Sequence, residues 1–145
     1  ELFQTFYVLI THELVHRGQF LLRSYKASFD MMNRKIKVDN KIINDDSLTS
    51  DDKNRMLVKS YLSMIEEIMA YANQIIEELR FHGLTNKEII EKIKGLKIDS
   101  NLSAGIKMYN DYFSLADKDD LKIIKRLFKY MYQYVVGEEK HSFII

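Results

Sequence analysis

Residues 51–81, DDKNRMLVKSYLSMIEEIMAYANQIIEELRF, decide the fold because their apolar side chains recur at three- and four-residue steps. That spacing lines one face of an α-helix. Thr49 or Ser50 is suited to cap its start, and the acidic pair at 51–52 suits the positive end of the helix dipole. The stretch therefore predicts one long helix, whose glutamates lie off a stripe formed by Leu57, Tyr61, Ile65, Ile68, Ala72, Ile75 and Leu79.

The N-terminal segment carries a second stripe of the same period, which predicts a helix on the order of 50 Å long if it is unbroken. Its first ten residues are apolar nearly all round, so this end is expected to be buried or to form a subunit contact. Residues 39–50 are polar, aperiodic and rich in Asn and Asp, which predicts a loop. The stripe consists of Phe3, Tyr7, Ile10, Leu14, Leu21, Tyr25, Phe29, Met32 and Ile36.

Shorter helices follow in the C-terminal half. Thr85 and Glu88 have the spacing of a capping box, which begins a short helix that ends at Gly95. Ser100 is expected to cap a fourth helix through Leu115, with a close helix crossing at Gly105, and residues 117–120 are expected to cap a fifth. The chain contains no proline, so nothing forbids long helices. We therefore predict one all-α domain over residues 1–145, an antiparallel bundle of four to five helices with the two long ones as its spine.

The composition excludes several classes of protein. With no cysteine, the chain has no disulfide, no thiolate nucleophile and no cysteine-ligated zinc, which fits the reducing cytoplasm. A net charge of +1 gives no global field for steering onto nucleic acid. The apolar run at residues 2–10 is too short to span a bilayer, so we expect no membrane span. Because it begins with Glu1 rather than methionine, we expect the chain to be a trimmed or excised piece.

One stretch could carry chemistry. Residues 12–16, HELVH, match HExxH, the pattern with which zinc proteases place two histidine ligands and a general base on one helix. Such enzymes also need a third ligand and normally a sheet beside the helix. Since no strand can be read anywhere in this sequence, we do not expect a protease, and we assign no catalytic residue.

Extended to residue 19, the stretch reads His12-x-x-x-His16-Arg17-Gly18-Gln19, which resembles the HxxxHRGQ signature of the DinB/YfiT-like helical bundles. In that family two histidines of one helix and a third from another helix bind a divalent metal. The resemblance implies a metal-dependent thiol transferase or hydrolase holding zinc or nickel. The third histidine of such a site would be His82 or His141.

The helical wheel favours a different interpretation. At 100° per residue His12 and His16 point almost opposite the apolar stripe of their helix, on a line with Thr5, Gln19 and Arg23. A metal site in a bundle core should share the buried face. We therefore predict that the two histidines are solvated or hydrogen-bonded at an interface, and that no cofactor is bound.

The last helix carries a basic face formed by Lys122, Lys125, Arg126 and Lys129, interleaved with aromatic residues. Such a face can bind nucleic-acid phosphates or an anionic membrane surface. In a chain of this charge a solvated face is the expected role, so we do not expect a nucleic-acid partner.

The sequence leaves three functions open, in order of preference. The preferred one is a non-catalytic helical module that senses a ligand or binds a protein partner. Its N-terminal helix would form a homodimer or pack against chain outside this sequence. The alternative is the metal-dependent enzyme that the HxxxHRGQ resemblance implies, and a nucleic-acid binder using the basic face comes third.

Overall fold

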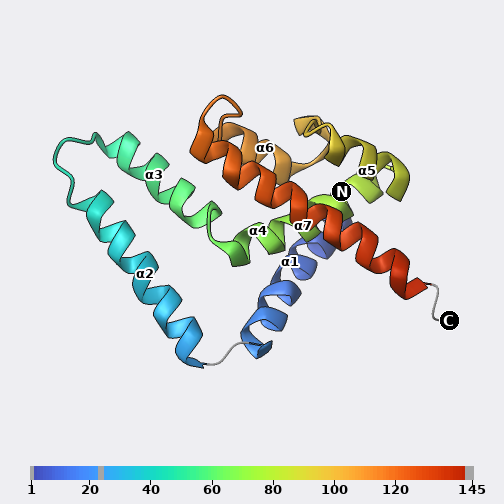
Figure 1. The fold of residues 1–145 in the computed structure, drawn as a ribbon, viewed down its shortest axis with the longest axis horizontal. Coiled ribbons are helices and arrows are strands. Elements are labelled where there is room, and N and C mark those ends of the chain that lie inside the picture. Colours follow the sequence, from blue (N-terminus) through green and yellow to red (C-terminus); the bar gives the residue numbers. More distant parts are fainter. Residues whose placement is uncertain (1, 23–24, 143–145) are drawn as a thin grey trace.

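The computed structural model describes residues 2–22 and 25–142, with side chains at residues 2–19 and 30–137, and these form seven α-helices and no strand (Figure 1). The predicted all-α class is therefore confirmed. The number of helices is larger than predicted because both long helices are divided. The helices are α1 (Leu2–Leu22), α2 (Tyr25–Ile43), α3 (Ser50–Leu62), α4 (Ile65–Phe81), α5 (Asn86–Lys94), α6 (Ala104–Tyr112) and α7 (Lys118–Ser142), with a short 3-10 turn, η1 (Ser100–Leu102).

The predicted second helix ends at Leu62, and the chain turns before α4 begins. The Ser63 hydroxyl donates to the carbonyl oxygen of Lys59 at 2.6 Å, and Met64 is extended, with φ −65° and ψ 137°. A serine that bonds back onto the preceding turn weakens helix propagation. The glutamates at 66 and 67 then suit the N-terminus of a new helix. This break places Glu67 in the first turn of α4.

The predicted N-terminal helix is also two helices. Helices α1 and α2 diverge from adjoining ends, and residues 23–24 between them lie outside the described part of the chain (Figure 1). The side chains of Leu21, Tyr25 and Phe29 in the predicted stripe lie outside it too. Helix α2 continues to Ile43, past the predicted start of the loop, and packs mainly on α3.

The core lies around α4, whose largest contacts are with α7 and α1. The predicted stripe is buried from Ile68 to Leu79, but Tyr61 and Ile65 are exposed. The break at residues 63–64 changes the helix direction, so Leu62 is buried there instead. On α7 the buried side chains recur at three- and four-residue steps; they are Ile124, Leu127, Phe128, Met131 and Val135.

The caps of the C-terminal helices fix the elements that cover α4. The capping box of Thr85 and Glu88 is present, and Asp117 accepts from two backbone amides at the start of α7. Helix α6 is capped by Ser103 rather than by Ser100, which begins η1. A Cβ atom at Gly105 would lie 2.7 Å from Cγ1 of Ile75, so glycine permits the close crossing of α6 over α4.

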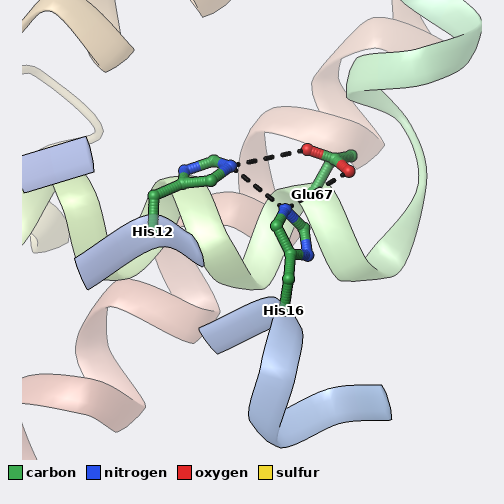
Figure 2. A group of neighbouring side chains, drawn as sticks. All are labelled: His12, His16 and Glu67. Carbon is green, nitrogen blue, oxygen red and sulfur yellow. Dashed lines mark hydrogen bonds and ion pairs between the residues drawn. The ribbon is translucent and has the colours of Figure 1, made fainter. Parts of the chain in front are cut away.

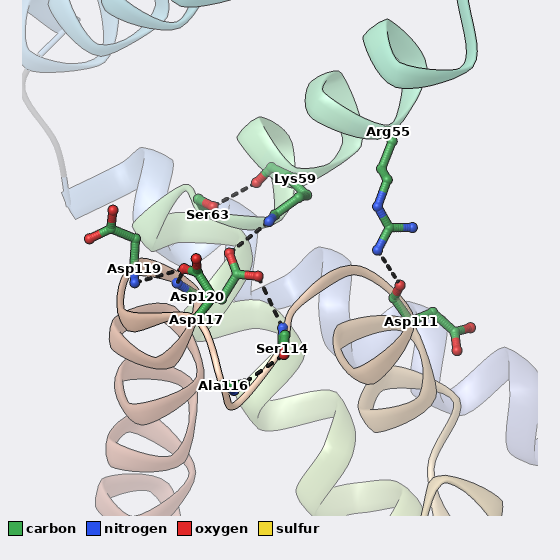
Figure 3. A network of polar contacts seen from close by, with 9 residues as sticks. All are labelled: Arg55, Lys59, Ser63, Asp111, Ser114, Ala116, Asp117, Asp119 and Asp120. Atoms are coloured by element: carbon green, nitrogen blue, oxygen red, sulfur yellow. Dashed lines mark hydrogen bonds and ion pairs between the residues drawn. The ribbon is translucent and has the colours of Figure 1, made fainter.

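A polar network holds α3 against the loop between α6 and α7 (Figure 3). Lys59 Nζ donates to Asp120 at 2.6 Å, and the other oxygen of that carboxylate accepts from the Ser114 amide at 3.0 Å. The guanidinium of Arg55 donates to the Asp111 carbonyl at 2.8 Å. These contacts fix the end of α3, and with it the turn that leads into α4.

Helices α1 and α4 run antiparallel, as the sequence predicted for the two long helices. The rings of Tyr7 and Phe81 meet at one end with centroids 5.5 Å apart, and Gln19 donates to the Glu66 carbonyl at the other end, at 3.2 Å. Within the described residues no helix combines the length and apolar character that crossing a membrane requires.

Candidate metal centre

Helix α1 packs on α4 with its histidines inward. Val8 and His12 are buried and His16 is half-buried, whereas Phe3, Ile10 and Leu14 of the predicted stripe are exposed. The wheel prediction that the apolar stripe is the packed face of this helix is therefore wrong, whereas His12 is hydrogen-bonded at an interface, one of the two roles expected for the histidines. The reason lies on α4, whose apolar face is covered by α6 and α7. What remains for α1 is a side of α4 that carries carboxylates and amides, and polar side chains of α1 pair with it.

His12 and His16 meet Glu67 in this interface (Figure 2). The two Nε2 atoms lie 3.1 Å apart. His16 Nε2 is 3.4 Å from Oε1 of Glu67, and His12 Nε2 is 3.7 Å from Oε2. One donor atom from each of the three residues lies within 4.8 Å of the other two. Two imidazoles and a carboxylate at this spacing have the composition of a three-ligand zinc site.

The tautomer of His12 is fixed by a chain of hydrogen bonds behind it. The Gln74 amide nitrogen donates to Oε1 of Glu78 at 2.9 Å, so the amide oxygen faces His12 Nδ1 at 3.1 Å. A carboxylate only accepts, which sets the orientation of the amide. His12 Nδ1 must therefore donate its proton to Gln74. In the neutral ring Nε2 then carries a lone pair toward the cluster, and in the protonated ring Nε2 donates toward Glu67 instead.

The tautomer of His16 is fixed in the same way. Gln19 Nε2 donates to the Glu66 carbonyl at 3.2 Å, and its amide oxygen faces His16 Nδ1 at 3.1 Å. His16 Nδ1 then carries the proton, and its Nε2 lone pair points at His12. Metal-ligating histidines characteristically donate their second ring N–H in this way. Three acceptors converge, and they need a cation between them, either a proton held on one imidazole or a metal ion.

Glu67 supplies the negative charge of the cluster. Burial raises the pKa of its carboxyl, but hydrogen bonding by His12 and Tyr61 and the charge of His16 outweigh this effect, so the pKa lies below its usual value. Its Oε2 atom is buried and has no partner within hydrogen-bond distance, since the nearby His12 Nε2 lies 3.7 Å away. A buried carboxylate oxygen without a partner is rare in native proteins, and a bound cation would satisfy it.

Two tyrosines border the cluster. The Tyr71 ring meets the edge of His12 with centroids 4.7 Å apart, and burial followed by the charge of Glu67 raises its pKa. Tyr61 is partly exposed, and burial together with Glu67 raises its pKa well above the ordinary value. Both hydroxyls therefore stay protonated at neutral pH, and Tyr61 connects the cluster with solvent.

Behind Gln74 the polar chain continues into α6. The second oxygen of Glu78 accepts from the Ser103 hydroxyl and from the Gly105 amide, the latter at 3.3 Å. Ser103 in turn caps α6 by accepting from the Ile106 amide at 3.0 Å. The orientation of His12 is thus linked to the start of α6 through the Gln74 amide, the Glu78 carboxylate and the Ser103 hydroxyl.

The structure brings together two of the three histidines predicted as metal ligands. His82 lies at the C-cap of α4, is exposed, and belongs to no group of metal-binding side chains within the described residues. It lines a separate cavity of about 520 Å³ with Gln4 and Val8. The side chain of His141 lies outside the described residues. The third member of the cluster, Glu67, was missed because one continuous helix placed it off the packed face.

The four residues of the predicted basic face, Lys122, Lys125, Arg126 and Lys129, are all exposed. Lys122 forms an ion pair with Asp119 at 2.7 Å, and this contact raises its pKa. Tyr130 and Tyr134, two of the interleaved aromatic residues, pack against the core. Tyr132, a third interleaved aromatic residue, is exposed.

Comparisons of the chain with models of protein families, with characterised proteins and with solved structures find no match.

Proposed function

We propose that this chain binds a divalent metal ion, zinc in the first place, through His12, His16 and Glu67. The observation that supports it is the convergence of two Nε2 lone pairs and a buried carboxylate whose Oε2 has no hydrogen-bond partner. Both imidazoles are oriented by glutamine amides, which is the supporting arrangement that metal-ligating histidines have. Nitrogen and oxygen donors suit zinc and also nickel or ferrous iron.

Three protein ligands leave a further coordination position, which is characteristic of catalytic rather than structural zinc sites. Such a position is consistent with the metal-dependent thiol transferase or hydrolase that the HxxxHRGQ resemblance implies. Bound there, zinc would supply Lewis acidity. Of the residues on this chain, Glu67 would balance part of the metal charge and Tyr61 would offer a neutral hydroxyl near the cluster.

Metal content tests this proposal. Protein purified without a histidine tag is expected to contain close to one equivalent of metal. After chelation it should take up one equivalent of zinc in competition with a chromophoric chelator, and nickel and ferrous iron should be titrated in parallel. Trace metal after purification together with no competition for zinc would show that the cluster holds a proton instead.

Gln74→Leu is expected to weaken zinc binding by about 10- to 100-fold, because His12 then loses the acceptor that fixes its tautomer. Gln133→Leu makes the same change on an exposed position of α7 and should leave the affinity unchanged. The zinc affinities of the two variants are compared by chelator competition, once their melting temperatures have been shown to agree. Equal affinity for both variants would mean that Gln74 has no part in the site.

A second candidate function rests on the outer face of α1. Leu2, Phe3, Phe6, Leu9 and Leu14 of this helix are more than half exposed. Exposed apolar patches of this kind mark interaction surfaces. This supports the interaction module expected from the sequence, with α1 as the helix that binds a second copy of the chain or another protein.

Light scattering tests that surface. A dimer is expected at micromolar concentration, and Phe3→Glu combined with Phe6→Glu should return it to a monomer without changing the helical circular dichroism. If the parent chain is monomeric and does not bind a hydrophobic dye, the exposed side chains of α1 do not form an interaction surface.

A further inference from the structure

Helix α1 is attached to the rest of the fold by an unusually polar face. Val8 is the only buried apolar side chain among residues 2–19, and the face of α1 that meets α4 also carries His12, His16 and Gln19. Hydrophobic burial by itself favours the opposite orientation, with the phenylalanines and leucines inward. Something other than apolar contact therefore holds α1 with its histidines against α4.

The core does not need α1. The main hydrophobic cluster runs from Leu62 to Val135 and, among the side chains that the structure describes, contains none of α1 or α2. Helix α1 makes its main contacts with α4 alone. Its removal would uncover Glu67 and Gln74, the groups of α4 that pair with its histidines, and water can satisfy both. The remaining helices can keep their packing while α1 separates from them.

The cluster itself decides whether α1 stays. With Nδ1 as the donor nitrogen of both histidines, three acceptors lie within 4.8 Å of one another, so docking needs a cation among them, either a proton held on one imidazole or a metal ion. A metal ion turns the same three acceptors into ligands, two from α1 and one from α4. Metal binding and docking of the helix are then one event, because the site exists only when the helices are together.

We propose that metal occupancy controls the docking of α1: the helix lies against α4 when the ion is bound and separates from it when the ion is removed, while the core from α4 to α7 stays folded. The inference rests on the proposed metal site and adds a conformational response to it. It also determines when the polar face of α4 is open to solvent.

Hydrogen exchange of the full chain, measured by mass spectrometry after chelation and after zinc addition, tests this coupling. If α1 opens only from the metal-free state, its exchange should slow by about a hundredfold when free zinc is 100 times the Kd. Amides in residues 68–79 and 121–135, within the core of α4 and α7, should not change. Glu67→Gln should lose most of the zinc response in α1, and Glu91→Gln, an exposed change on α5, should keep it.

The outcomes separate the two proposals. Stoichiometric zinc uptake with unchanged exchange in residues 2–22 would overturn the coupling and leave the metal site in place. Zinc that slows exchange equally across α1, α4 and α7 would also overturn it, because the whole fold would then respond. No zinc uptake would remove both proposals.

Discussion

The double variant His12→Ala, His16→Ala is expected to reduce bound zinc from close to one equivalent to a trace. It removes two of the three donor atoms that lie within 4.8 Å of one another, and a single buried carboxylate does not hold zinc against a chelator. We expect the affinity to fall by far more than the 10- to 100-fold typical of losing a supporting hydrogen bond. Metal analysis and chelator competition measure the effect.

His82→Ala is the matched control for that experiment. His82 is exposed and lies outside the cluster, so its loss should leave zinc binding within a factor of two of the parent. Equal losses in the control and the double variant would indicate non-specific binding to histidines. Full retention of zinc in the double variant would place the metal elsewhere in the chain.

The parts of the fold that could be read from the sequence are those fixed by local chemistry. The capping box at Thr85 and the cap at Asp117 depend on neighbouring residues, and both are present. The buried positions of α7 follow a clean 3.6-residue period because one face packs along much of its length. The antiparallel pairing of α1 with α4 was also predicted correctly.

The candidate site could be predicted only in part, because its third member depends on a helix break. Periodicity carries through Ser63 and Met64 without interruption, and only the hydrogen bond of Ser63 to Lys59 and the extended Met64 show where the helix ends. The break rotates Glu67 into the interface. No pattern of apolar residues can indicate such a position, since a buried carboxylate reads as a surface residue.

The orientation of α1 could not be predicted for a related reason. The wheel assumes that the most apolar face of a helix is the packed one. On α4 the apolar positions are already used by α6 and α7, so the face left for α1 is polar. The sequence does contain the signal in retrospect, since His12, His16 and Gln19 lie on one face of α1, as do Glu67, Gln74 and Glu78 on one side of α4.

Glu78→Ala is expected to lower the free energy of unfolding by about 2–4 kcal/mol, even with metal removed. The carboxylate accepts from Gln74, Ser103 and the Gly105 amide; Ser103 and Gly105 lie at the tight crossing of α4 and α6, and Gln74 faces α1. Deleting it leaves them without their acceptor. Because Ser103 also caps α6, the start of that helix should be weakened as well.

Glu78→Ala should also weaken zinc binding, because Glu78 is linked to His12 through Gln74. Without Glu78 the Gln74 amide is free to turn its nitrogen toward His12, which removes the acceptor that fixes the tautomer. Zinc affinity should fall by about tenfold or more. Urea unfolding of the chelated protein gives the stability change, and Glu91→Ala should stay within about 0.5 kcal/mol of the parent. A Glu78→Ala variant that lost stability but kept full zinc affinity would show that the α6 end of the polar chain does not orient His12.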